Sequence, residues 1–192
     1  VFDAVTQTLQ HWRDLPEVRF VRHWHDHPAW VERVAATLRR AFDQDGEPER
    51  LLFSFHGMPL KTLYAGDPYH CECQKSARLI AEALQLPRDR WMVTFQSRFG
   101  PAKWLQPYTQ ETLEELARSG VKRVAVVCPG FVADCLETLE EIAIECREAF
   151  LAAGGEHFTY VPCLNADPEW IRDFATILTP HLSGWPMRTC VE

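Results

Sequence analysis

Short apolar runs, several of them continuous, alternate along this sequence with longer segments of helical period, and this alternation constrains the fold most. The runs are "VRFVRHW" (18–24), "LLFSF" (51–55), "WMVTFQ" (91–96), "RVAVVC" (123–128) and "HFTYVPC" (157–163). A strand that is apolar at nearly every position is buried on both faces, as strands of parallel sheets are. The sequence therefore predicts an α/β fold, a doubly wound parallel sheet of five strands with helices on both faces.

Helical spacing fills the stretches between these runs. Pro28 suits the first turn of a helix over 28–42, and Gly154 and Gly155 are typical stop signals for the longest helix, expected over 134–155. The chain has 192 residues, of which 46% are hydrophobic and 24% charged, which is enough apolar material for one sizeable core. We therefore expect one domain over residues 1–192.

Composition excludes some classes of function. The 27 acidic and 20 basic side chains give a formal charge of -7, which disfavours nucleic acid as a partner and suits cations. No apolar run approaches the ~20 residues that span a bilayer, and the first residues lack the layout of a signal peptide, so we expect no transmembrane segment and a cytoplasmic protein. Seven cysteines without a dense framework predict mostly reduced thiols.

His56 is the first candidate for chemistry, because it directly follows the run 51–55 and is followed by Gly-Met-Pro. Ligands of doubly wound sheets bind beyond the carboxyl ends of the strands, where this turn would hold the ring. An imidazole there can accept a proton near neutral pH or bind a divalent metal, although a ring bonded to a loop carbonyl is an equally ordinary interpretation. Nucleotide-binding glycine motifs do not follow any of the runs.

Carboxylates recur at helical spacing in the longest predicted helix. Asp134, Glu137, Glu141 and Glu145 would share one face, with Asp134 and Glu137 in the first turn. The opposite face would be an apolar stripe of Leu136, Leu139, Ala143, Cys146 and Phe150. Such a pattern is usually the solvated side of an amphipathic helix. However, like charges four residues apart are destabilising, and a ladder of carboxylates can pass hard divalent cations along it.

Two further clusters contain metal-ligating residue types. His23, His25 and His27 alternate, so that on a continuing strand they would share a face and could chelate a metal, or they could lie in a solvated loop. Cys71 and Cys73 are spaced as C-x-C rather than as the C-x2-C of structural zinc sites, and a thiolate cluster would need a distant cysteine.

Two aromatic residues, Trp104 and Phe131, lie in predicted loops after strands, between glycines and prolines. Loop aromatics often only cover a core. At this edge of the sheet they could also contact a flat, apolar ligand.

Several motifs together resemble one family. The motifs "SFHGMP" (54–59), "GDPY" (66–69), "TFQSRFGPAKWLQPYT" (94–109), "CPGFVADCLETLEEI" (128–142) and "VPCLNADPEWI" (161–171) follow the order seen in ferrochelatase of the bacterial type. The resemblance extends from near Arg19 to near Trp185 and is to the C-terminal part of that family, including the second of its two Rossmann-like lobes. It implies that residues 1–192 are a C-terminal chelatase lobe, that the first lobe is absent and that the chain is a fragment.

The resemblance also implies an activity and a set of site residues. Ferrochelatase is a lyase that inserts ferrous iron into protoporphyrin IX in the last step of haem biosynthesis. In this sequence His56 matches its active-site histidine, which accepts a proton or binds the metal, and Glu137 matches its active-site glutamate. The matching metal path, on a long helix with a π-type widening, consists of Asp134, Glu141 and Glu145 together with His56 and Glu137. The matching porphyrin contacts are Trp104 and Phe131.

The sequence departs from the animal members of the family at two places. Cys135 stands where those members have a second histidine, so no role of that imidazole is expected here. Their cysteine-rich C-terminal extension holds a [2Fe-2S] cluster, whereas this sequence has only Cys190 near its end, so a cluster is unsupported and no tightly bound cofactor is expected. Fe2+ is expected as substrate. Two alternatives remain at this stage, a chelatase for another tetrapyrrole or metal, such as a cobalt chelatase, and a non-enzymatic metal- or haem-binding module.

Overall fold

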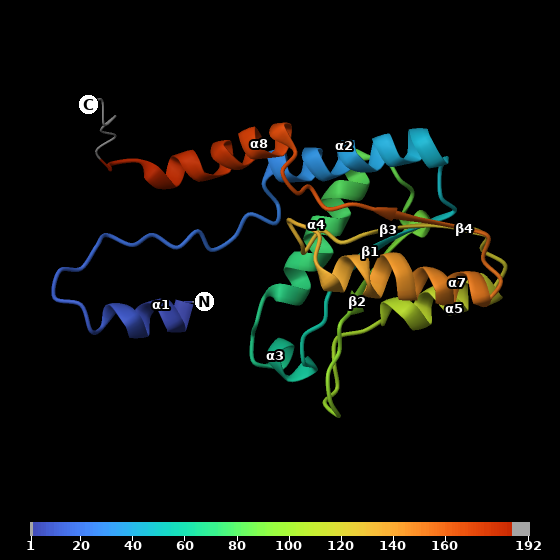
Figure 1. Ribbon diagram of the computed structural model, residues 1–192, viewed down its shortest axis with the longest axis horizontal. Helices are drawn as coiled ribbons and strands as arrows, with labels where there is room; N and C mark the ends of the chain where they lie inside the picture. The colour runs from blue at the N-terminus through green and yellow to red at the C-terminus, as the bar shows by residue number, and fades with distance from the viewer. Residues whose placement is uncertain (1, 186–192) are drawn as a thin grey trace.

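The computed structural model describes residues 2–185 and contains a four-stranded sheet (Figure 1). Its strands are β1 (Arg50–His56), β2 (Trp91–Gln96), β3 (Arg123–Val127) and β4 (His157–Val161). All neighbouring strands are parallel, in the order β2-β1-β3-β4. The predicted α/β class with a doubly wound parallel sheet is therefore confirmed.

Helices cover both faces of this sheet. The helices are α1 (Phe2–Leu9), α2 (Pro28–Asp45), α3 (Leu60–Tyr64), α4 (Tyr69–Ala83), α5 (Thr109–Arg118), α6 (Leu136–Leu139), the π-helix η2 (Glu141–Cys146), α7 (Arg147–Ala152) and α8 (Pro168–Leu178), with short 3-10 turns at η1 (Arg88–Arg90) and η3 (Thr179–Leu182). Helices α2, α4 and α8 pack on one face, and α5, η2 and α7 pack on the other. No helix among residues 2–185 is long and apolar enough to cross a membrane.

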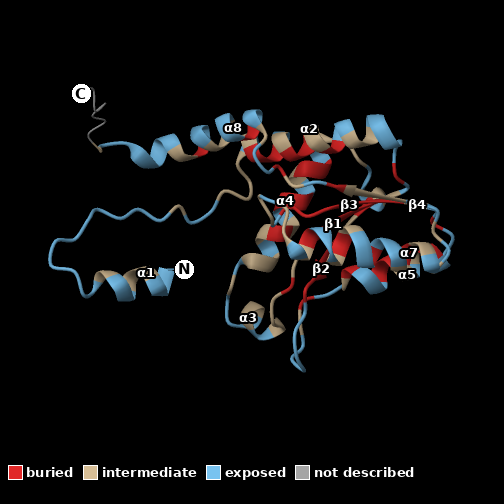
Figure 2. Ribbon diagram, in the orientation of Figure 1, coloured by how far each residue is buried: buried red, intermediate tan, exposed pale blue. Residues whose placement is uncertain are grey.

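Alternation along the strands divides the core between these two layers. Phe53 and Phe55 of β1 belong to the core beneath α2, α4 and α8, whereas Leu52 belongs to the core beneath α5 and α7. Figure 2 accordingly shows the buried residues concentrated in the strands and on the inward sides of the helices. Both faces are therefore covered, which is why the strands are apolar at nearly every position.

The fifth predicted strand is wrong. Residues 18–24 form no strand and run outside the sheet as irregular chain. Arg19 Nη1 donates instead to the carbonyl oxygens of His181 (2.8 Å) and Ser183 (2.6 Å), just beyond α8. Trp24 packs against Trp30 and other aromatic rings of α2 and α8. A run rich in β-branched and aromatic residues suits any extended segment with apolar contacts, and here Trp24 makes those contacts with helices.

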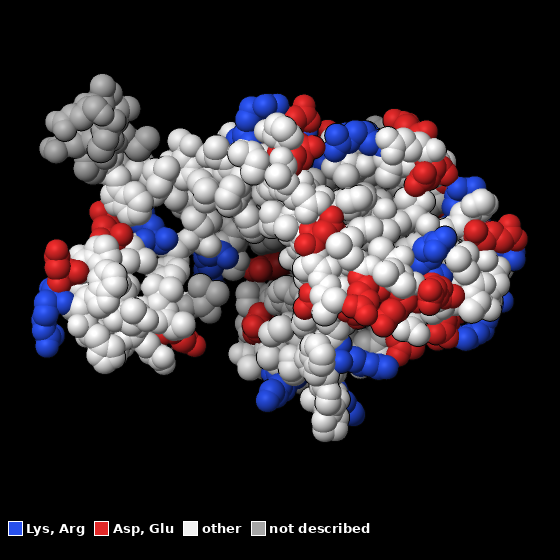
Figure 3. Space-filling view, viewed as in Figure 1, with Lys and Arg blue, Asp and Glu red and all other residues white. Residues whose placement is uncertain are grey.

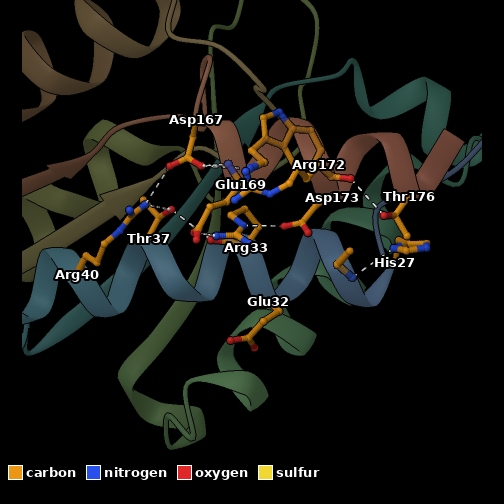
Figure 4. Close-up of polar contacts among 12 residues, drawn as sticks. His27, Glu32, Arg33, Thr37, Arg40, Asp167, Glu169, Arg172, Asp173 and Thr176 are labelled. Carbon is orange, nitrogen blue, oxygen red and sulfur yellow. Dashed lines mark hydrogen bonds and ion pairs between the residues drawn. The ribbon is translucent and has the colours of Figure 1, made fainter.

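Helix α8 is fastened to α2 by charged groups as well as by aromatic packing (Figure 4). Arg33 of α2 pairs with Asp173 (2.7 Å) and with Glu169, both on α8. Asp167 accepts hydrogen bonds from the backbone N–H groups of Glu169 (2.8 Å) and Trp170 (3.1 Å), which makes it the N-cap of α8. These contacts fix the layer that supports one face of the sheet.

The connections leave one place open at the carboxyl edge of the sheet. The link from β1 to β2 passes through α4 on one face, and the link from β2 back to β3 passes through α5 on the other face. Ligands of such sheets bind where the connections diverge in this way, beyond the carboxyl ends of the strands. In this chain that place lies between the ends of β1 and β3, where His56 and the loop after Val127 meet.

Candidate active site

The His56 ring is held at the end of β1 in a defined orientation. Its Nδ1 lies 2.7 Å from the carbonyl oxygen of Gly57. A carbonyl oxygen can only accept a hydrogen bond, so Nδ1 carries the proton, and in the neutral ring Nε2 keeps its lone pair. Tyr69 of α4 supports the same residue, because its hydroxyl donates to the His56 carbonyl oxygen at 2.9 Å. The result is a half-buried imidazole whose basic nitrogen is not used by the turn.

The two predicted aromatics lie close to this turn. The Phe131 ring centroid is 6.4 Å from that of His56. Trp104 is anchored by its Nε1, which donates to the Phe99 carbonyl oxygen at 3.0 Å, and its ring approaches Gly57. His56 is therefore brought together with both Trp104 and Phe131, as the sequence predicted.

Gly57 is required by this close approach, and its replacement by alanine gives the first prediction. A Cβ there would lie 2.7 Å from the Gln96 carbonyl oxygen and 3.2 Å from the Trp104 ring. Because the nearer atom is backbone of the adjacent strand, we expect Gly57→Ala to lower the free energy of unfolding by about 1–3 kcal/mol. Urea unfolding measures this. Gly130→Ala is the control, since its Cβ would meet side chains rather than backbone, Phe55 at 3.3 Å and the Tyr69 hydroxyl at 3.9 Å. Equal stability of the Gly57→Ala and wild-type proteins would contradict the prediction.

The long helix predicted over 134–155 is divided by a π-helical turn. The Glu145 N–H donates to the Glu140 carbonyl oxygen (2.9 Å), a bond that spans five residues rather than four. This widening confirms the one that the family resemblance implied. It also makes part of the predicted apolar stripe wrong, because Leu136 and Leu139 are exposed while Thr138 is buried in their place.

The carboxylates form one side of a cleft of about 670 Å³ between η2, the end of β2 and α5. Three of the four predicted residues line it, Glu137, Glu141 and Glu145. Sequence reasoning missed its other acidic lining residues, Glu111, Glu114 and Glu140. In Figure 3 acidic side chains gather over the surface of α7 and its neighbours. The cleft is therefore suited to cations.

Glu141 is oriented by two residues that the sequence did not single out. The Ser97 N–H donates to Glu141 Oε1 at 2.7 Å, and the Ser97 hydroxyl donates to Oε2. Gln96 Nε2 contacts Oε2 at 3.4 Å and donates to the Glu137 carbonyl oxygen at 2.7 Å. Ser97 adopts a left-handed conformation (φ 59°), which turns its backbone toward the helix. The only signal in the sequence was the position of both residues at the carboxyl end of a strand.

Glu137 lies at the end of the cleft nearest to His56 and is a carboxylate at neutral pH. A hydrogen bond from the Cys135 thiol is the main cause that holds the pKa of Glu137 below its usual value, and the charge that His56 can bear contributes in the same direction. Cys135, at the position where the resemblance places a histidine of the animal enzymes, thus has a contact of its own with this carboxylate.

Asp134 differs from the other three predicted carboxylates. It precedes α6 and its N-cap Cys135, so the predicted place in the first helical turn is wrong, and it does not line the cleft. Its oxygens accept hydrogen bonds from the Tyr160 hydroxyl, Asn165 Nδ2 (2.6 Å) and the Cys163 N–H (3.1 Å). Burial opposes ionisation, but these bonds outweigh it and hold the pKa of Asp134 below its usual value. This geometry favours a structural role for Asp134.

The remaining predicted clusters lie elsewhere. Of the alternating histidines, His23 and His25 meet Glu72 of α4, while His27 caps α2 by accepting from the Ala29 N–H (3.2 Å). Among residues 2–185, Cys71 and Cys73 join no group of three metal-ligating side chains, and burial raises the pKa of Cys73 to about 12. Cys190 lies outside the described residues.

Comparisons with known proteins show the family of the chain. The family model described as Ferrochelatase matches residues 1–182. Proteins named ferrochelatase from Azoarcus sp. (strain BH72) and Aromatoleum aromaticum are 63% and 55% identical over 185 residues, covering 96% of this chain and 51% of each relative. The protein of that name from Methylibium petroleiphilum is 55% identical over 192 residues, which is 100% of this chain and 53% of the relative. The chain spans about half the length of the curated relatives it matches. With a family model that covers most of its residues and relatives of this similarity, the chain belongs to the ferrochelatase family.

Proposed function

We propose that the protein inserts ferrous iron into protoporphyrin IX to make protohaem, and that this chain contributes the groups that deprotonate the ring and supply the metal. One observation above all supports this proposal. His56 offers an unused basic nitrogen at the end of β1, and the row Glu137, Glu141 and Glu145 leads away from it along an acidic cleft.

Metallation of a porphyrin makes three physical demands, which are loss of water from Fe2+, distortion of the macrocycle and removal of its pyrrole N–H protons. His56 Nε2 would accept a pyrrole proton or bind the incoming metal, since the other ring nitrogen is committed to the Gly57 carbonyl oxygen. Glu137, ionised and close enough for its pKa to respond to the charge of His56, would relay that proton or deliver Fe2+. Together they would couple metal arrival to deprotonation.

Glu141 and Glu145 would bring the metal to this point. Carboxylate oxygens hold hydrated divalent cations and exchange them readily, which suits transfer rather than storage. Glu141 is fixed by Ser97 and Gln96, so its position would stay constant while cations pass. Asp134 remains a predicted member of this path, although its hydrogen bonds favour the structural role.

The aromatic pair would contact the macrocycle itself. Trp104 and Phe131 flank His56, and large apolar side chains stand exposed nearby on the same edge, among them Phe99, Leu136 and Leu139. Exposed apolar groups around a polar site are typical of a surface that a ligand or another part of the protein covers. We propose that porphyrin covers part of it and that a further lobe, of the length by which the relatives exceed this chain, closes the cleft.

Product formation across a panel of metals and rings tests the substrate assignment. The complete gene product is given Fe2+, Co2+ or Zn2+ anaerobically with protoporphyrin IX or with a cobalt-accepting corrinoid precursor, and the metallated products are quantified by absorption. The proposal predicts the highest kcat/KM for Fe2+ with protoporphyrin IX. A preference for another ring would indicate a different chelatase, and binding without any product would indicate a carrier.

Ser97→Ala tests the role of the acidic cleft. The change removes one of the hydrogen bonds to the Glu141 carboxylate and leaves the backbone bond in place. Because a hydrogen bond to a charged group is worth about 1.5–3 kcal/mol, we expect the KM for Fe2+ to rise about tenfold while kcat and the KM for porphyrin change little. Ser119→Ala, at the exposed end of α5, should leave all three constants unchanged. An unaltered iron KM in Ser97→Ala would remove Glu141 from the metal path.

A further inference from the structure

A second group of metal-ligating side chains lies apart from the acidic cleft, where the irregular segment before α2 crosses the first turns of α4. His23, His25 and Glu72 each place one ligand atom within 4.8 Å of the others. His23 Nδ1 is 2.7 Å from Glu72 Oε1, and the two imidazole rings are 6.0 Å apart and nearly perpendicular. None of the three lines the acidic cleft.

An independent observation concerns His25. Its Nδ1 is buried and has no hydrogen-bond partner among residues 2–185. A buried polar atom normally has a partner, because leaving it unpaired costs about 1–3 kcal/mol. The residue with this unpartnered nitrogen is therefore one of the three whose ligand atoms converge here.

The local chain geometry explains why the two histidines converge. Residues 25–26 form a turn, in which the His27 N–H donates to the Trp24 carbonyl oxygen at 2.9 Å, and this bend keeps His25 close to His23. Trp24 points into the aromatic cluster of α2 and α8 and leaves its neighbours on the side that faces α4. The nearby positive charge of Lys75 is paired with Asp26 (2.5 Å), so it does not stand unopposed beside the group.

We propose that His23, His25 and Glu72 bind a divalent first-row transition metal ion of the zinc type, with a water in the fourth position. Two imidazoles and one carboxylate are a ligand set of that class, whereas Mg2+ and Ca2+ prefer oxygen ligands throughout. The ion would replace the direct contact between His23 and Glu72 and would give the His25 ring a partner. No part of this proposal depends on the function proposed above.

Such a site would act as a clamp. It would join the segment before α2, which is otherwise irregular between α1 and residue 27, to the helix that carries Tyr69. The Tyr69 hydroxyl supports the His56 carbonyl oxygen, and Glu72 lies one turn further along the same helix. Metal occupancy would thereby stiffen the side of the molecule behind the His56 turn.

Competition titration of the metal-free complete gene product with Zn2+ against a chromogenic chelator tests the site. We expect His25→Ala and Glu72→Gln each to lose one tightly bound equivalent of Zn2+. The affinity for that Zn2+ ion should fall at least about 100-fold, which is more than the loss of a residue that only supports a ligand causes. His27→Asn is the matched control, because it removes an imidazole from the same motif while keeping a good N-cap. His27→Asn should bind as many equivalents of Zn2+ as the wild type. His56→Ala should keep the Zn2+ equivalent that His23, His25 and Glu72 bind.

A thermal readout distinguishes binding at this site from damage to the fold. Zn2+ should raise the Tm of the wild type and of His27→Asn, and it should raise the Tm of Glu72→Gln by less, since a ligand stabilises only the state that binds it. Glu72→Gln keeps the size and hydrogen-bonding capacity of the side chain, so it still tests metal binding at this site if His25→Ala does not fold. Wild-type stoichiometry in Glu72→Gln, or an equal loss in His27→Asn, would overturn the proposal.

Discussion

Replacement of His56 by alanine is expected to lower kcat for the proposed iron insertion by about 10²–10⁴-fold, the usual effect of losing a general base. The ring nitrogen Nε2 is the group that the turn leaves free, while Nδ1 is bound to the Gly57 carbonyl oxygen. Because the side chain is only half-buried, its loss should leave the fold intact. Steady-state kinetics under anaerobic conditions, with circular dichroism of the same preparation, measure both effects.

Two further observations separate a catalytic from a structural role of His56. Added imidazole should restore part of the activity of His56→Ala if the ring acts as base or ligand, and it should have no effect on a merely distorted site. His11→Ala, which removes an exposed histidine of the N-terminal segment, is the control for general effects. Near-normal activity of a folded His56→Ala protein would exclude this residue from the chemistry.

Glu137→Gln is expected to have the second-largest effect. It should lower kcat/KM for Fe2+ about 100-fold, which is the lower end of the range observed when a group that transfers protons is lost. The amide keeps the shape but can neither relay a proton nor offer a charged ligand. Glu148→Gln, an exposed acid on α7, should be neutral.

The dependence of kcat/KM on pH should also report on Glu137. The thiol of Cys135 holds the pKa of Glu137 below its usual value, so Glu137 stays ionised until the solution is more acidic than that lowered pKa. Because a general base has to be unprotonated, protonation of the His56 ring would by itself lower kcat/KM on the acid side. Loss of the Glu137 charge should add a separate step at lower pH, below the ordinary range of a glutamate, and Glu137→Gln should lack that step. The same step in the variant would assign it to another group.

The fold was largely predictable because burial on both faces leaves a simple signature. Four of the five predicted strands form, and each is apolar at most positions. The segment 18–24 is the run for which the strand prediction is wrong. Trp24 packs against helix α8 and Arg19 contacts carbonyl groups beyond it, and these partners are far away in the sequence.

Residue type pointed to His56 and the carboxylate row as candidates, but it also allowed a ring bonded to a loop carbonyl and a solvated helix face, and the family resemblance favoured a site. Contacts that depend on packing geometry could not be predicted. Helical spacing at a constant angle put Leu136 on the buried side, yet the π-turn at Glu145 changes which residues face the core. Nothing in the spacing could show that Ser97 orients Glu141, or that Glu72 meets the alternating histidines, because those contacts arise only when separate elements pack.

The most direct test of the account is the fluorescence of protoporphyrin IX bound to the complete gene product when Fe2+ is added without oxygen. We expect rapid loss of the fluorescence of the metal-free porphyrin, together with the appearance of the absorption spectrum of protohaem. Tight binding of both porphyrin and Fe2+ with unchanged fluorescence would contradict it, and would mean that this edge of the sheet carries its ligands without joining them.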